Sequence, residues 1–138
     1  GGAARDVLER IIVKKHDYRA SFQCLRNSAT DFSTLNACAA LWDGQWHLAV
    51  GARPKKAKFL EGEDLGLPAR FSPEELDAAC QRARDLNYGT DRRASAAYRA
   101  ELAEVLSRRA ILEAAAQQDV ATELRLAAEA AKPKGVSA

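Results

Sequence analysis

The residues best suited to chemistry are Asp91, Arg92 and Arg93, which stand directly ahead of a run whose apolar residues recur at helical spacing. Guanidinium groups and the free N–H groups of a helix N-terminus both attract anions, so this cluster could bind a phosphate or a carboxylate. The alternative is an internal brace, in which Asp91 caps the helix or pairs with Arg93, while Arg99 or Arg109 donates to loop carbonyls. We favour the brace, because no base, nucleophile or metal ligand stands nearby.

The other reactive side chains do not form a recognisable catalytic group. Cys24, Cys38 and Cys80 are far apart and make no Cys-x-x-Cys pair, which argues against a zinc knuckle and against a disulfide scaffold. His16 and Asp17 are neighbours whose side chains would diverge on a strand. The sequence therefore predicts no catalytic residue and no metal site.

Strand patterns fill the first half of the chain. Val7–Val13 is rich in β-branched residues, and Arg19–Leu25 alternates polar with apolar residues, so that the apolar face is expected to pack. Asp43-Gly44 suits a type I′ turn between two further strands. With a two-residue turn, Trp42 pairs with Gln45, and one face of the hairpin gathers the large apolar residues Leu35, Leu41, Trp46, Leu48 and Val50. Lys56–Leu60 predicts one more strand.

Helical patterns follow the strands. Ser72 can cap a helix with Pro73 at its first position, and Glu75 can complete a capping box. A second helix is expected to begin near Ser95 and to bury a stripe formed by Tyr98, Leu102, Val105 and Leu106.

Strands before helices indicate an α+β fold, with a three- to four-stranded, mostly antiparallel sheet followed by a cluster of two to three helices packed on one face. We expect residues 1–118 to form a single α+β domain. Residues 119–138 are expected to form a helical extension and a flexible tail.

Several segments resemble, in the right order, the last domain of the FAD-binding subunit of molybdenum-containing hydroxylases, the carbon monoxide dehydrogenase and xanthine dehydrogenase family. The main one is Asp91–Arg99, with the sequence DRRASAAYR. Asp31–Ser33 opens a strand of small residues, Gly51–Pro54 follows a tryptophan-bearing strand, and Ser72–Leu76 begins a helix. The similarity runs roughly from Ile11 to Leu112.

The resemblance implies one domain of a longer flavoprotein, which closes the flavin pocket and supports subunit docking while electrons pass from iron-sulfur clusters to an acceptor. The domain would not be catalytic alone. It implies FAD in the parent subunit, bound mainly by an N-terminal FAD-binding domain, and further partners that carry molybdopterin and iron-sulfur clusters. The glycines of this chain form no Gly-x-Gly-x-x-Gly and no P-loop, so no cofactor is expected in the chain itself.

The resemblance also points to residues beside the flavin ring. It places Gln23, Thr30 and Asp31 next to the flavin in the intact subunit. Relatives tend to have a lysine or arginine in place of Gln23, and a cation there would favour negative charge on the reduced flavin, whereas an amide can only form hydrogen bonds. The bland interpretation is an exposed strand residue at Gln23 and a turn residue at Asp31.

The formal charge of +2 predicts no nucleic-acid partner, and no apolar run is long enough to cross a bilayer, so no membrane partner and a cytoplasmic location are expected. The densest basic run, Arg53–Lys58, is expected to be a solvated strand and turn. The main alternative function is a stand-alone protein- or ligand-interaction domain that uses its sheet face or basic helix.

Overall fold

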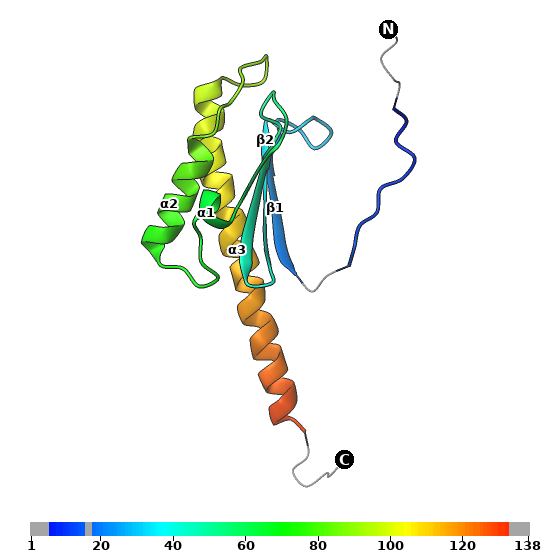
Figure 1. Ribbon diagram of the computed structural model, residues 1–138, viewed down its shortest axis with the longest axis vertical. Helices are drawn as coiled ribbons and strands as arrows, with labels where there is room; N and C mark the ends of the chain where they lie inside the picture. The colour runs from blue at the N-terminus through cyan, green and yellow to red at the C-terminus, as the bar shows by residue number, and fades with distance from the viewer. Residues whose placement is uncertain (1–5, 16–17, 133–138) are drawn as a thin grey trace.

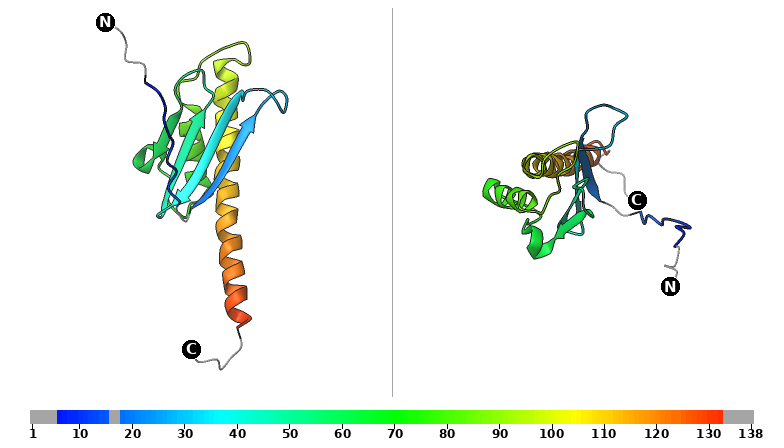
Figure 2. Two further views of the ribbon diagram at one scale, coloured as in Figure 1. Left: turned by 90° about the vertical axis from the view of Figure 1, so that its right-hand side faces the viewer. Right: turned by 90° about the horizontal axis from the view of Figure 1, so that it is seen from above.

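The computed structural model describes residues 6–15 and 18–132, apart from the side chains of residues 118–123, and its folded part is a sheet covered on one face by helices (Figures 1 and 2). The sheet is four-stranded and antiparallel, in the order β1-β2-β3-β4. Its strands are β1 (Arg19–Leu25), β2 (Leu35–Trp42), β3 (Gln45–Gly51) and β4 (Lys58–Glu61). The helices are α1 (Gly62–Leu65), α2 (Pro73–Arg84) and α3 (Ala96–Ala130). The α+β prediction is confirmed.

The β2–β3 hairpin has the predicted turn and register. Asp43 and Gly44 have φ angles of 51° and 71°, as a type I′ turn requires. Trp42 pairs with Gln45, and the pairing continues to Asn36 opposite Gly51. The predicted face is buried against the helices and contains Leu35, Leu41, Trp46, Leu48 and Val50.

The start of α2 is the predicted capping box. The Ser72 Oγ accepts a hydrogen bond from the Glu75 N–H at 3.2 Å, and the Glu75 carboxylate accepts one from the Ser72 N–H at 2.8 Å. Cys80 lies on the buried face of this helix, and burial raises the pKa of its thiol to about 11. This thiol is therefore protonated at neutral pH and serves packing rather than nucleophilic chemistry.

The buried stripe of α3 differs from the predicted one. Tyr98 and Val105 are 46% and 43% exposed, and of the predicted stripe only Leu106 is fully buried. The residues that α3 buries most completely are mainly small: Arg99, Ala103, Leu106, Ser107, Ala110, Ile111 and Ala114. The helix packs on β1 and β2, and the middle of the buried face of β2 consists of the small side chains of Ala37 and Ala39, between Leu35 and Leu41. Alanines on both elements let their backbones approach closely, and the prediction failed because it looked for large residues.

α3 is continuous to Ala130 and projects beyond the sheet (Figure 1). The boundary expected at residue 118 falls inside this helix, so a separate extension beyond it stays a prediction, and residues 133–138 of the expected tail lie outside the described part. No helix in residues 6–15 and 18–132 combines the length and apolar character of a membrane span.

Two predictions about the N-terminal part were wrong. Residues 6–15 form no strand, although they carry β-branched side chains. In β1 the polar face is the covered one: Ser21 is 6% exposed, whereas Phe22 is 58% exposed. Alternation reveals two faces but not which of them a helix covers, and here Glu113 of α3 supplies a polar partner for Ser21.

Candidate functional site

Gln23 lies in β1 on the face that α3 covers, where it belongs to a small polar cluster. Its amide nitrogen donates to the Ser21 hydroxyl at 3.2 Å and also to the Glu113 carboxylate. The Ser21 hydroxyl donates to the same Glu113 oxygen at 2.7 Å. Both amide donors of Gln23 are thus engaged, which leaves its carbonyl oxygen as the group that can serve a ligand.

Thr30 and Asp31 lie in the loop between β1 and β2, and Thr30 is exposed. The Asp31 carboxylate accepts a hydrogen bond from the Phe32 N–H at 2.8 Å and lies 3.5 Å from the Arg93 guanidinium. That guanidinium also lies over the Phe32 ring, 5.4 Å from its centroid. Asp31 and Arg93 therefore join the β1–β2 loop to the loop that precedes α3.

These two loops border a depression of about 470 Å³, lined by Asp31, Asp91, Arg92 and Arg93. The structure thus brings Asp31 together with the acidic and arginine-rich motif that the sequence singled out. Gln23 does not line this depression and is held instead by Ser21 and Glu113. The flavin-adjacent role of Gln23, Thr30 and Asp31 stays a prediction.

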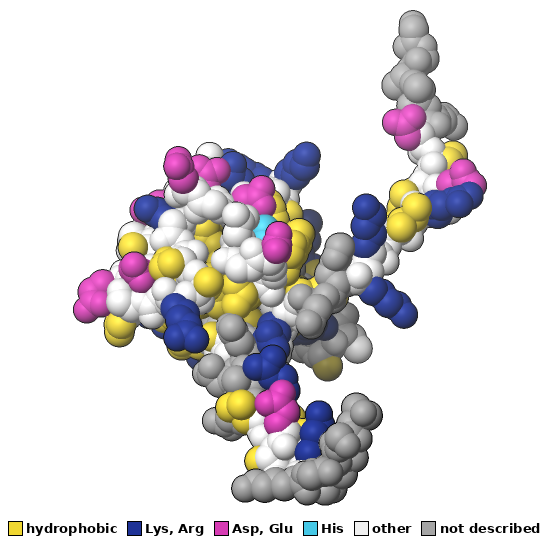
Figure 3. Space-filling model, turned by 60° about the horizontal axis from the view of Figure 1, so that its bottom comes forward, with side chains coloured by type: hydrophobic (Ala, Val, Ile, Leu, Met, Phe, Trp, Pro, Cys, Tyr) yellow, Lys and Arg dark blue, Asp and Glu magenta, His cyan; other side chains and the backbone are white. Residues whose placement is uncertain are grey.

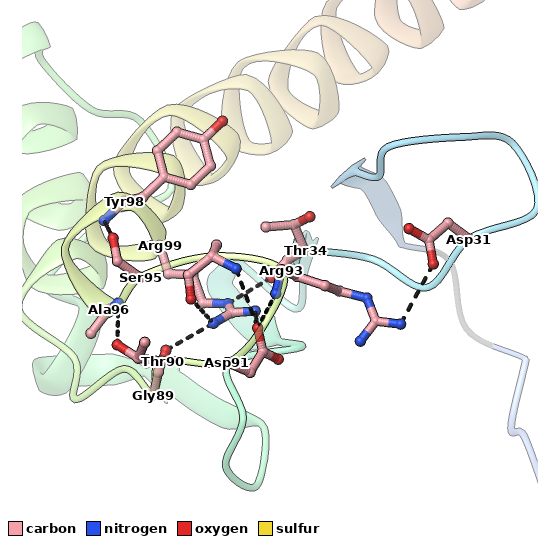
Figure 4. Close-up of polar contacts among 11 residues, drawn as sticks. Asp31, Thr34, Gly89, Thr90, Asp91, Arg93, Ser95, Ala96, Tyr98 and Arg99 are labelled. Atoms are coloured by element: carbon pink, nitrogen blue, oxygen red, sulfur yellow. Dashed lines mark hydrogen bonds and ion pairs between the residues drawn. The ribbon is translucent and has the colours of Figure 1, made fainter.

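Arg99 is the centre of the motif (Figure 4). Its side chain is 1% exposed, and its Nε donates to the Thr34 carbonyl at 2.9 Å. Its Nη1 donates to the carbonyls of Gly89 and Ala94 at 2.9 and 2.8 Å, while its Nη2 donates to the Asp91 carboxylate at 2.7 Å. One buried guanidinium therefore fixes the start of β2 and both ends of the loop ahead of α3.

The brace interpretation is confirmed, with two changes in its partners. Asp91 pairs with Arg99, and the same Asp91 oxygen accepts hydrogen bonds from the N–H groups of Arg93 and Ala94 at 2.8 and 3.2 Å. The helix is capped by Ser95, whose hydroxyl accepts from the Tyr98 N–H at 3.1 Å. The Arg93 side chain is paired with Asp31 rather than with Asp91.

The pairing with Arg99 and the two backbone N–H donors lower the pKa of the Asp91 carboxyl. A lowered folded pKa adds stability that is fully present above the unfolded value of about 3.9 and is lost as pH falls through the folded pKa. We therefore expect the Asp91→Asn variant to lose less stability than the parent chain between about pH 5 and the folded pKa. Urea denaturation at a series of pH values measures the difference.

A carboxyl NMR titration gives the direct check on Asp91. Its midpoint in the folded chain should fall below its midpoint in the urea-unfolded chain, which serves as the control. A folded midpoint equal to or above the unfolded one would contradict the pairing.

A second buried arginine was missed in the sequence. Arg53 opens the basic run that was expected to be solvated, yet it is 8% exposed. Its guanidinium donates to the Lys56 carbonyl at 2.9 Å and to the Asn87 carbonyl, and it lies 5.7 Å from the centre of the Tyr88 ring. The expectation holds for the exposed lysines of the run but is wrong for Arg53, which braces the loop from within. Pro54 directly after it was the only local signal of a fixed turn.

The described residues contain no group of three or more His, Cys, Asp or Glu side chains that could hold a metal ion. What they offer instead is an arginine-braced loop pair beside a polar strand–helix cluster. Such an arrangement can bind and position a group, but it presents no nucleophile paired with a base.

Residues 20–114 match the family model of the CO dehydrogenase flavoprotein C-terminal domain. This match covers well over half of the chain, which therefore belongs to that family. No curated protein is significantly similar in sequence.

Solved structures share the fold. Carbon monoxide dehydrogenase from Hydrogenophaga pseudoflava, in a form that lacks the Mo-pyranopterin moiety, superimposes with a TM-score of 0.64 at 20% identity over 75% of this chain and 38% of that one. Quinoline 2-oxidoreductase from Pseudomonas putida 86 gives 0.59 at 20% identity, over 74% and 38%. Reconstituted CO dehydrogenase from Oligotropha carboxidovorans gives 0.57 at 23% identity, over 72% and 37%. The chain thus spans under two fifths of the length of these solved chains.

Proposed function

We propose that this chain is the C-terminal domain of the FAD-binding subunit of a molybdenum-dependent hydroxylase or dehydrogenase in the cytoplasm. The observation that carries the proposal is the family match over residues 20–114. In this function the domain closes one side of the flavin pocket and supports the docking of subunits that carry molybdopterin and iron-sulfur clusters. Electrons from those clusters pass through the flavin to an acceptor.

In this function the residues of this chain lie at one edge of the flavin ring, and its phosphates are held elsewhere. Arg92 and Arg93 line the depression beside Asp31 and offer guanidinium donors there, and Gln23 retains a carbonyl acceptor. The FAD-binding domain that precedes this one in the parent protein would hold the pyrophosphate. When bound, the flavin supplies the electron-accepting and electron-donating chemistry.

The contribution of this chain is then to position and to shield. The Arg99 brace holds the β1–β2 loop and the loop ahead of α3 in fixed relation, because it donates to Thr34 on one side and to Gly89 and Ala94 on the other. Fixed loops present their side chains to the ring edge without further ordering when the flavin binds, and they exclude water from that edge.

Flavin retention tests this function. Purified alone, the chain should carry no flavin and should bind added FAD weakly or not at all in equilibrium dialysis. Produced together with the flavin-carrying polypeptide of its parent protein, it should copurify and slow the release of FAD from that polypeptide. Stoichiometric FAD on the chain alone, or an FAD release rate that is the same with and without the chain, would overturn the proposal.

A further inference from the structure

No helix or strand of the described residues covers the sheet face that points away from the helices (Figure 2). The strand register places Phe22, Cys38, Ala49 and Phe59 in one row across all four strands. The next row contains Ala20, Ala40, His47 and Glu61. We call this surface the open face. On the two central strands its residues are Cys38, Ala40, Ala49 and His47.

Large apolar side chains stand at the edges of the open face. Phe22 on β1 and Phe59 on β4 lie on the two opposite edge strands and are 58% and 50% exposed. Trp42 stacks on His47 with 4.3 Å between ring centroids, and His47 stacks on Phe59 at 5.7 Å. Small residues between aromatic walls leave room for another element to approach the sheet closely. Figure 3 shows hydrophobic side chains gathered beside the histidine on this flank.

One ring nitrogen of His47, on the open face, has no hydrogen-bond partner among the described residues. The ring is 6% exposed, and its Nδ1 lies 3.0 Å from the Glu61 carboxylate. The nitrogen without a partner is Nε2. An unpaired buried polar atom lowers stability, so a docked partner that formed a hydrogen bond with this nitrogen would remove that cost.

The segment ahead of β1 continues this apolar surface. Residues 6–15, here called the N-terminal arm, run out on the same side of the sheet as the open face (Figures 1 and 2). The arm carries five large apolar side chains that are 75% to 86% exposed: Val7, Leu8, Ile11, Ile12 and Val13. Neighbouring apolar surfaces of this extent mark an interaction site.

We infer that the open face and the N-terminal arm together form the docking surface for the flavin-carrying domain that precedes this one in the parent protein, an inference that rests on the proposed function. Only three residues separate the arm from β1 in the sequence, so a domain joined through it is held near the open face at a local concentration of about millimolar. A free second copy of this chain cannot match that concentration. Apart from His47 and Glu61, the two central rows hold only apolar side chains, so the matching surface is mainly apolar.

The test places a lysine on the open face, as Phe22→Lys or Phe59→Lys. Tyr98→Lys and Leu124→Lys are the matched controls, because these α3 side chains are similarly exposed, at 46% and 66%, but lie off the open face. The isolated 138-residue chain should unfold at nearly the same urea midpoint in all four variants, since none of these side chains is buried. Phe59→Lys should show the largest shift of this midpoint, because it removes the ring that stacks on His47.

In the whole parent protein, the open-face variants should release FAD and admit protease to the N-terminal arm at least about tenfold faster, since docking would bury an unpaired charge. The controls should stay within about twofold of the parent protein.

Three outcomes would overturn the inference, and they differ from one another. If the control and open-face variants had equal effects, the open face would not be the docking surface, and the proposed function would still stand. If the isolated chain dimerised and Phe22→Lys made it monomeric, the open face would be a contact between two copies of this chain. A parent protein whose FAD release does not depend on this domain at all would remove the proposed function and the docking surface with it.

Discussion

Replacing Arg99 with methionine is expected to lower the free energy of unfolding by about 3 kcal/mol, because removing one member of a buried charged network leaves its partners unpaired. Arg99 is 1% exposed and donates four hydrogen bonds, three of them to backbone carbonyls. Methionine fills a similar volume but donates none of them. Urea denaturation followed by circular dichroism gives the difference.

Arg109→Met is the matched control for this substitution, because Arg109 is an exposed arginine of the same helix. Its stability should stay within about 0.5 kcal/mol of the parent chain. Arg99→Lys should fall between the two, since an ammonium group keeps the charge but cannot reach all four acceptors. Equal losses at Arg99 and Arg109 would show that the brace contributes nothing of its own.

Trp46→Ala should cost about 4 kcal/mol, the range measured when a buried tryptophan is truncated and leaves a cavity. The side chain is 2% exposed and lies against the edge of the Phe71 ring, with 5.9 Å between the ring centroids. Its indole N–H donates to the Ala69 carbonyl at 3.3 Å, an acceptor that alanine would leave without this donor. Thermal and urea unfolding measure the loss.

The same hairpin provides the control for Trp46. Trp42 lies on the opposite face, is 42% exposed and stacks on His47, so Trp42→Ala should cost about 1 kcal/mol. Because the same residue type is replaced at both positions, the difference between the two losses measures the effect of burial. A larger loss at Trp42 than at Trp46 would reverse the assignment of the two faces.

The features that could be predicted from the sequence are those set by neighbouring residues. The Asp43-Gly44 turn fixed the β2–β3 register, since two positive φ angles permit only one short hairpin geometry. Ser72 and Glu75 identified the start of α2 because a capping box needs only a spacing of three residues. The order of strands and helices then gave the fold class.

The features that could not be predicted depend on partners distant in the chain. Nothing near Ser21 indicates that Glu113 of α3 will cover it, so the covered face of β1 was assigned the wrong way round. The buried stripe of α3 was missed because alanines become core residues only when another element approaches closely, and here that element is β2 with its small residues Ala37 and Ala39. Residues 6–15 have the pattern of a strand but do not pair with either edge strand, β1 or β4.

The candidate site shows the same division. The motif from Asp91 to Arg99 was recognised as a brace, yet which arginine would be buried depends on carbonyls as distant as Thr34. The resemblance located Gln23 and Asp31 but gave no sign of their partners in this chain, Glu113 and Arg93.

The alanines between α3 and the sheet restrict how relatives of this chain can diverge. Ala103, Ala110 and Ala114 have no exposed surface, and neither do Ala37 and Ala39. A larger side chain on one element must be matched by a smaller one on the other, or the two must separate. These positions should therefore vary together across homologues, toward glycine or serine, while the exposed Tyr98 and Val105 drift freely.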